Sequence, residues 1–172
     1  MKLRVFGTVN DSIVDGPGLR YTVFTQGCTH QCVGCHNPQS HDLQGGYEIN
    51  IQDILIDIDN NPLLDGVTFS GGEPFLQVQP LIELAKEIKK RGLHLMIYSG
   101  YTYEELMEMD DSCQQLLSLC DTLVDGRFVL SLRSLSLLYK GSSNQRIIRV
   151  QDSLKQHTII EQRINDYGEF VE

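Results

Sequence analysis

Three cysteines lie within eight residues, and this cluster constrains the fold more than any other feature. Cys28, Cys32 and Cys35 form a C-x3-C-x2-C run. Thiolates are soft ligands that suit iron–sulfur clusters, zinc or Cu(I). A complete cluster or zinc site normally takes four protein ligands. Because the run supplies three, either a distant residue completes the site or one metal atom stays open to another ligand.

Zinc is one alternative for this site. A Cys3His site could recruit His30, His36 or His41. However, structural zinc sites usually combine two short ligand pairs separated by a longer span, and the sequence has no second pair. A four-cysteine cluster would need Cys113 or Cys120, which we expect to be buried and inert. The spacing therefore favours a [4Fe–4S] cluster held by three cysteines.

Composition and charge exclude several classes of protein. A chain of 172 residues suggests one domain, and an odd number of cysteines does not fit a secreted disulfide framework. The net charge of -9 argues against general nucleic-acid binding. No stretch reaches the roughly 18 apolar residues of a membrane span, and the first residues lack the apolar core of a signal peptide. We therefore expect a cytoplasmic protein that does not bind membranes.

One segment departs from this acidic balance. Five basic residues and no acidic ones lie between residues 127 and 149, namely Arg127, Arg133, Lys140, Arg146 and Arg149. The segment is either a solvated face or a contact for a carboxylate ligand or an acidic partner.

Strand patterns alternate with helical patterns along the chain, which predicts parallel βαβ units in a doubly wound sheet or a partial barrel. We expect helices to begin near Asn50, at Pro80 and at Thr102, which opens a capping box, and another over residues 113–119. Residues 151–172 read as a loose tail or helix. Strands are expected at residues 20–25, 66–70, 93–98, 122–125 and 145–150.

Special segments follow four of these strands. They are the cysteine run, Gly71-Gly72-Glu73-Pro74, Ser99-Gly100 and Asp125-Gly126. Functional loops of parallel α/β folds gather at the carboxyl ends of the strands, so we expect these segments to meet on one rim. An open iron there could be chelated by the amine and carboxylate of S-adenosylmethionine. Gly71 and Gly72 would allow close backbone approach, and Glu73 would add a charge-assisted contact.

These motifs resemble a known family. The cysteine run with residues 70–74 (Ser-Gly-Gly-Glu-Pro) is similar to radical S-adenosylmethionine enzymes. Residues 15–20 (Asp-Gly-Pro-Gly-Leu-Arg) resemble an N-terminal motif of glycyl-radical activases. Further segments are similar to the activating proteins of anaerobic ribonucleoside-triphosphate reductases, at residues 34–38, 99–102, 124–128 and 141–146.

The resemblance implies a fold and a set of site residues. The fold would be α/β, a partial, open (β/α)6 TIM-type barrel of the radical SAM type with parallel strands. It would form one domain over residues 1–172, with a core at about 5–150 and a tail at 151–172. Many relatives place an aromatic residue for adenine where this chain has Gly34, so backbone at 34–36 would serve instead. The metal ligands would be Cys28, Cys32 and Cys35, and the cofactor-binding residues Gly34, Cys35, His36, Asn37, Ser70, Gly71, Gly72, Glu73 and Ser99.

The resemblance also implies an activity. A reduced flavodoxin or ferredoxin would pass one electron to the cluster, which would cleave S-adenosylmethionine to methionine and a 5′-deoxyadenosyl radical. That radical would take a hydrogen atom from a backbone glycine in the large subunit of the reductase. No catalytic acid or base is expected, because the cofactors carry the chemistry. The alternatives are a formate-lyase-type activase, a radical enzyme acting on a small molecule, and a non-catalytic zinc-binding interaction module.

Overall fold

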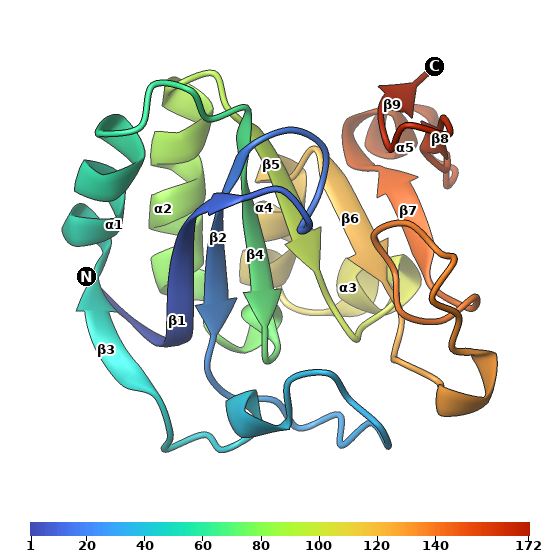
Figure 1. The fold of residues 1–172 in the computed structure, drawn as a ribbon, viewed down its shortest axis with the longest axis horizontal. Coiled ribbons are helices and arrows are strands. Elements are labelled where there is room, and N and C mark those ends of the chain that lie inside the picture. Colours follow the sequence, from blue (N-terminus) through green and yellow to red (C-terminus); the bar gives the residue numbers. More distant parts are fainter.

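A seven-stranded sheet forms the centre of the computed structural model, which describes residues 1–172 (Figure 1). Its strand order is β3-β1-β2-β4-β5-β6-β7. The strands are β1 (Lys2–Ser12), β2 (Arg20–Thr25), β3 (Tyr47–Asn50), β4 (Gly66–Gly71), β5 (His94–Tyr98), β6 (Thr122–Asp125) and β7 (Arg146–Arg149). A separate ribbon pairs β8 (Arg163–Ile164) with β9 (Phe170–Val171) near the C-terminus.

Five α-helices accompany the sheet, and none is long and apolar enough to cross a membrane. Asn50 caps the first helix, and the predicted capping box of Thr102 and Glu105 is present. The helix predicted from Pro80 begins two residues earlier, at Val78. Residues 151–172, predicted as a loose tail or a helix, contain most of a helix followed by the β8–β9 ribbon. The helices are α1 (Ile51–Asp59), α2 (Val78–Lys90), α3 (Tyr103–Glu108), α4 (Asp111–Leu119) and α5 (Val150–Gln156).

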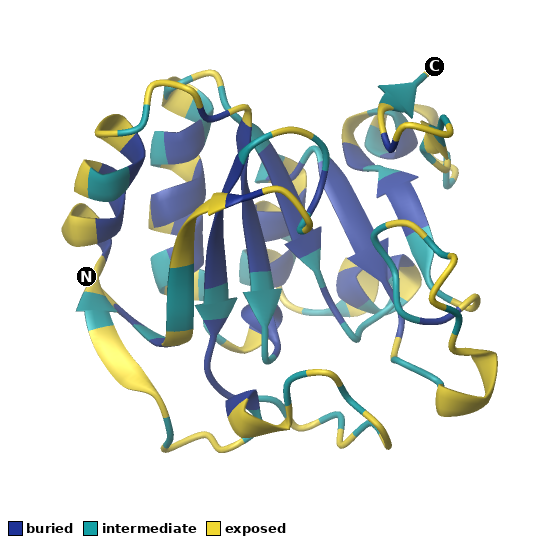
Figure 2. Cartoon of the chain, in the orientation of Figure 1, coloured by how far each residue is buried: buried dark blue, intermediate teal, exposed yellow.

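The two faces of the sheet have different surroundings, because successive side chains of a strand point to opposite faces. Val23, Phe69 and Ile97 belong to the main core with the buried sides of the helices (Figure 2). The intervening residues face the other way, where Met96 and Val124 pack in a small second cluster with side chains of the tail. One face of the sheet therefore builds the core, and the other is free to line a site.

The prediction of an α/β fold with parallel central strands is confirmed for β2, β4, β5 and β6. The prediction of six parallel β/α units is wrong, because β1, β3 and β7 pair antiparallel at the two edges. A parallel neighbour needs a crossover of about a dozen or more residues. Residues 13–19 are too few to form such a crossover between β1 and β2, and no α-helix lies between β6 and β7 to form one there.

Arg20 is fully buried on the helix-free face of the sheet. Its guanidinium donates to Thr68 Oγ1 at 2.8 Å, to the carbonyl oxygens of Val67 and Pro17 at 3.0 Å each, and to His94 Nδ1 at 2.9 Å. None of these partners is a carboxylate, and burial lowers the pKa of Arg20 to about 10. Arg20 thereby fixes the turn before β2 against β4 and β5.

Stability should fall on mild acidification because His94 must stay neutral to accept the hydrogen bond of Arg20. Burial, and next the charge of Arg20, lower the pKa of His94 to about 4, against about 6.5 in an unfolded chain. The unfolded chain therefore binds the proton first as the pH falls, and stability is lost from about pH 6.5 towards pH 4. We expect His94 to cost roughly 2 kcal/mol of unfolding free energy between pH 7.5 and pH 5.

Urea unfolding at the two pH values measures this cost. His94→Gln should remove most of the His94 contribution, because a glutamine stays neutral throughout this range. Equal pH dependence in the wild-type protein and the variant would contradict the assignment.

Candidate metal and cofactor site

A cavity of about 740 Å³ lies at the carboxyl ends of the parallel strands. All three cysteines of the run line it, together with the turns that follow β4, β5 and β6. The predicted convergence of the special segments on one rim is therefore confirmed. The volume is within the range of about 300–1,000 Å³ that is usual for small-molecule sites.

The three thiols of Cys28, Cys32 and Cys35 are unpaired and partly buried. Burial raises the pKa of the Cys28 thiol, and the negative groups of Glu73, Cys32 and Cys35 raise it further. Three thiolates side by side would repel one another, and bound cationic iron would offset that repulsion. No three His, Cys, Asp or Glu side chains are already grouped as ligands of one ion. Three cysteine thiols are a donor set that fits an iron–sulfur cluster.

Glu73 joins three loops below the cavity and is fully buried. Its Oε1 accepts hydrogen bonds from His30 Nε2 at 2.7 Å, Gly100 N at 2.8 Å and Ser99 Oγ at 2.9 Å. Its Oε2 accepts from Phe75 N at 2.9 Å. One carboxylate thus ties the cysteine loop, through His30, to the turn after β4 and the turn after β5.

The expected direct contact of Glu73 with a cofactor stays a prediction, and in this structure its carboxylate contacts protein groups instead. Glu73 does not line the cavity, and both of its oxygens already have partners. His30 is further confined by Tyr101, whose ring meets it edge-on at a centroid distance of 4.6 Å. A Cβ on Gly100 would lie 2.4 Å from the His30 ring, so this contact needs a glycine. Glu73 is placed to hold the cysteine loop in position.

Gly71 and Gly72 do line the cavity, and the backbone beside them explains why both are glycine. A Cβ on Gly71, at φ +94°, would lie 2.5 Å from Thr25 N, and one on Gly72 would lie 2.3 Å from Gly27 O. Gly72 N donates to Thr25 O at 2.8 Å, and Glu73 N donates to Gly27 O at 2.7 Å. These amides are occupied, so the turn offers carbonyl oxygens, which suit an ammonium group better than a carboxylate.

Most of the other predicted residues also lie on the cavity. His36, Asn37, Ser70 and Ser99 line it, whereas Gly34 does not. The sequence motifs did not identify the polar and aromatic side chains by which the helix-free face of the sheet lines the cavity. Phe24, Ser70 and Tyr98 occupy strand positions that alternate with core positions. This alternation in the sequence could have indicated that they face away from the core. The missed lining residues include Ser12, Asp15, Phe24, Tyr98 and Tyr139.

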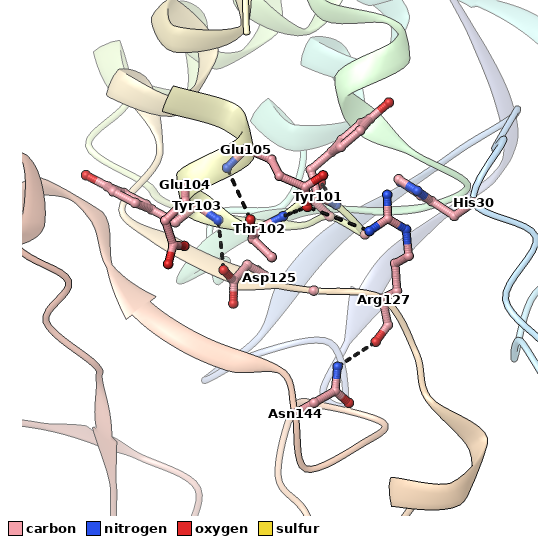
Figure 3. A network of polar contacts seen from close by, with 12 residues as sticks. His30, Tyr101, Thr102, Tyr103, Glu104, Glu105, Asp125, Arg127 and Asn144 are labelled. Carbon is pink, nitrogen blue, oxygen red and sulfur yellow. Dashed lines mark hydrogen bonds and ion pairs between the residues drawn. The ribbon is translucent and has the colours of Figure 1, made fainter. Parts of the chain in front are cut away.

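The turn after β6 is held by the loop that precedes β7 (Figure 3). Asn144 Nδ2 donates to the carbonyl oxygen of Arg127 at 2.8 Å, and Gln145 Nε2 donates to that of Gly126 at 2.9 Å. Asp125 accepts from Tyr103 N at 2.8 Å and so joins α3 to the same turn. Asn144 and Gln145, in the motif at residues 141–146, therefore anchor the backbone of the turn after β6.

The basic segment is largely neutralised by carboxylates from elsewhere in the chain. Only Arg133 and Lys140 have no carboxylate within 4.0 Å. The hydrogen bonds that Arg146 donates to Asp125 and Glu104 raise the pKa of its guanidinium. The segment is therefore not a continuous positive surface. The ion pairs join Arg127 to Glu105 at 3.7 Å, Arg146 to Glu104 and to Asp125 at 2.5 Å each, and Arg149 to Asp152 at 2.7 Å.

Cys113 and Cys120 lie apart from the cavity. Both are buried, as predicted, with 3% and 0% of their surface exposed. Burial raises the pKa of the Cys113 thiol to about 11 and also raises that of Cys120, so both stay protonated near neutral pH. Neither is placed to complete the metal site.

Comparison with known proteins identifies the class of this chain. Residues 14–148 match the family described as a 4Fe-4S single cluster domain, which spans more than half of the chain. The chain is 37% identical over 145 residues to the anaerobic ribonucleoside-triphosphate reductase-activating protein of Vibrio cholerae, covering 80% of this chain and 92% of that protein. The counterpart of Escherichia coli is 34% identical and covers 77% and 90%. The chain belongs to the family of anaerobic ribonucleoside-triphosphate reductase-activating proteins.

Two other proteins are similar over smaller parts of the chain. The pyruvate formate-lyase-activating enzyme of Clostridium pasteurianum is 39% identical over 117 residues, covering 63% of this chain and 49% of that enzyme. Among solved structures, QueE from Escherichia coli has a TM-score of 0.46 and 16% identity, covering 59% of this chain and 54% of its own. The latter likeness is too loose to bear on function.

Proposed function

We propose that this chain activates an anaerobic ribonucleoside-triphosphate reductase by placing a glycyl radical on its large subunit. The cofactors would be a [4Fe–4S] cluster and S-adenosylmethionine, and the electron donor a reduced flavodoxin or ferredoxin. The observation that carries the proposal is that three thiols and a Gly-Gly turn line one cavity, in a chain of this family.

Each part of the site has a role in this proposal. Cys28, Cys32 and Cys35 would be the three protein ligands of the cluster and would leave one iron open to S-adenosylmethionine. Carbonyl oxygens of the Gly71-Gly72 turn receive the amino group of S-adenosylmethionine. When bound, the two cofactors supply the one-electron chemistry that ends with a hydrogen atom being removed from a glycine of the partner. Backbone and side chains that orient the ligand come from His36, Asn37, Ser70 and Ser99.

The surroundings of the cavity support a polypeptide substrate. Ile13 and Val14 line it while remaining 75% and 73% exposed, so apolar side chains stand at its edge where a glycine-bearing loop would enter. Helices cover one face of the four parallel strands (Figure 1). Phe24, Ser70 and Tyr98 of the opposite face line the cavity. We also propose that the seven-stranded sheet is one side of a partial, open barrel of the TIM type.

Electron paramagnetic resonance tests the proposal directly. Reduced protein mixed anaerobically with S-adenosylmethionine and the reductase should give a glycyl-radical doublet, and omitting S-adenosylmethionine should abolish it. A parallel sample with pyruvate formate-lyase tests the alternative that the shorter likeness to its activating enzyme suggests. A radical on the lyase alone, or no radical with an intact cluster, would reject the reductase as substrate.

A further inference from the structure

Phe128 lies in the cavity wall beside the metal-binding loop. Its ring meets the ring of His36 edge-on, with a centroid distance of 5.1 Å and an interplanar angle of 62°. His36 directly follows Cys35, so this aromatic pair stands next to a proposed cluster ligand. No step described above uses the ring of Phe128.

Two glycines lie beside this ring. A Cβ on Gly141 would lie 3.0 Å from Cδ2 and 3.2 Å from Cε2 of Phe128. Gly34, which has φ +77°, would place a Cβ 2.9 Å from Cδ1 of Leu130 and 3.4 Å from Cε1 of the Phe128 ring. A side chain at Gly141 would crowd Phe128, whereas one at Gly34 would meet Leu130 first and only touch the ring. The loop that contains Gly141 is therefore shaped around Phe128.

The backbone on both sides of Phe128 is fixed before any ligand arrives. Side chains of Gln145 and Asn144 hold the carbonyl oxygens of the two preceding residues, as described above. On the other side, Val129 N donates to Ser142 Oγ at 3.2 Å. A backbone held in this way loses little conformational freedom on binding, which favours affinity.

We propose that Phe128, with His36 at its edge, is the surface on which the adenine ring of S-adenosylmethionine stacks. The inference rests on the proposed function. Adenine is a flat heteroaromatic ring that stacks favourably on an aromatic face, and the glycine turn after β4 does not provide such a face. Tyr139 is a weaker candidate, because its hydroxyl is bonded to Gly168 O at 2.6 Å and its ring packs on Phe170.

Binding measurements on protein with a full complement of iron test this inference. The ligands are S-adenosylmethionine, 5′-methylthioadenosine, which keeps adenine but lacks the amino-acid part, and methionine, which lacks adenine. Phe128→Ala should raise the Kd of both adenine-containing ligands about 5- to 150-fold and leave that of methionine unchanged. Phe128→Tyr should bind like the wild-type protein. Phe6→Leu, at an exposed position on β1 away from the cavity, is the matched control.

Phe128→Leu preserves most of the apolar volume and replaces Phe128→Ala as the test variant if the alanine variant fails to retain iron. It lacks an aromatic face, so its Kd for the two adenine-containing ligands should still rise several-fold. Wild-type affinity in Phe128→Leu, or an equal loss for methionine, would overturn the adenine assignment. A wild-type protein with an intact cluster that binds no S-adenosylmethionine would overturn the proposed function instead.

Discussion

Replacing Cys28, Cys32 or Cys35 with alanine should yield an anaerobically purified protein that is colourless and nearly free of iron. Each variant would leave two thiols in the loop, and neither Cys113 nor Cys120 lines the cavity to replace the third. Cys113→Ala and Cys120→Ala should remain brown with about four irons per chain, because these two thiols are buried outside the cavity. Cleavage of S-adenosylmethionine should be lost in the first three variants and largely kept in the other two.

Iron content and the visible absorption spectrum measure this outcome, with circular dichroism to confirm that each variant is folded. Loss of the cluster in Cys113→Ala or Cys120→Ala would show that the ligands are wrongly assigned. Colourless wild-type protein carrying stoichiometric zinc would favour the zinc-binding module. The structure already weakens one such site, because Nε2 of His30 is engaged by Glu73.

The central strands were predictable because burial leaves a local signature in the sequence. β2 and β6 coincide with the expected ranges, since runs of β-branched and apolar residues form them and nearly every residue is buried. The short edge strand β3 was missed because three of its four residues are exposed and carry no such signature. The antiparallel edges were missed because pairing direction depends on connection length and tertiary contacts, which periodicity does not report.

The residues that line the site were easier to predict from the sequence than the function of each residue. Residues that follow parallel strands meet at one edge wherever the fold is of this class, so motif positions alone located the cavity. Glu73 is different, because its partners come from three loops separated by more than 20 residues. The ion pairs that neutralise Arg127 and Arg146 are likewise invisible in a linear charge count.

Glu73→Ala should destabilise the protein and deplete its iron, because Glu73 links the cysteine loop to the rest of the site. The substitution leaves four buried donors without their acceptor, on His30, Phe75, Ser99 and Gly100. Breaking a buried charged contact of this kind costs about 3–5 kcal/mol. Glu73→Gln keeps the size of the side chain and one accepting oxygen but turns an amide group towards a donor. Its loss of stability and iron should therefore lie between those of the wild-type protein and Glu73→Ala.

Urea unfolding and iron content, compared with Glu83→Ala at an exposed position on α2, separate two roles for Glu73. A residue that binds S-adenosylmethionine directly would, when replaced, leave stability and iron unchanged and weaken only the affinity for that ligand. A residue that positions the cysteine loop would reduce unfolding free energy and iron content together, in the order alanine, glutamine, wild type. Because Glu73 is fully buried and bonded on both oxygens, we expect the second pattern. Finding the first would restore a direct contact between Glu73 and the cofactor.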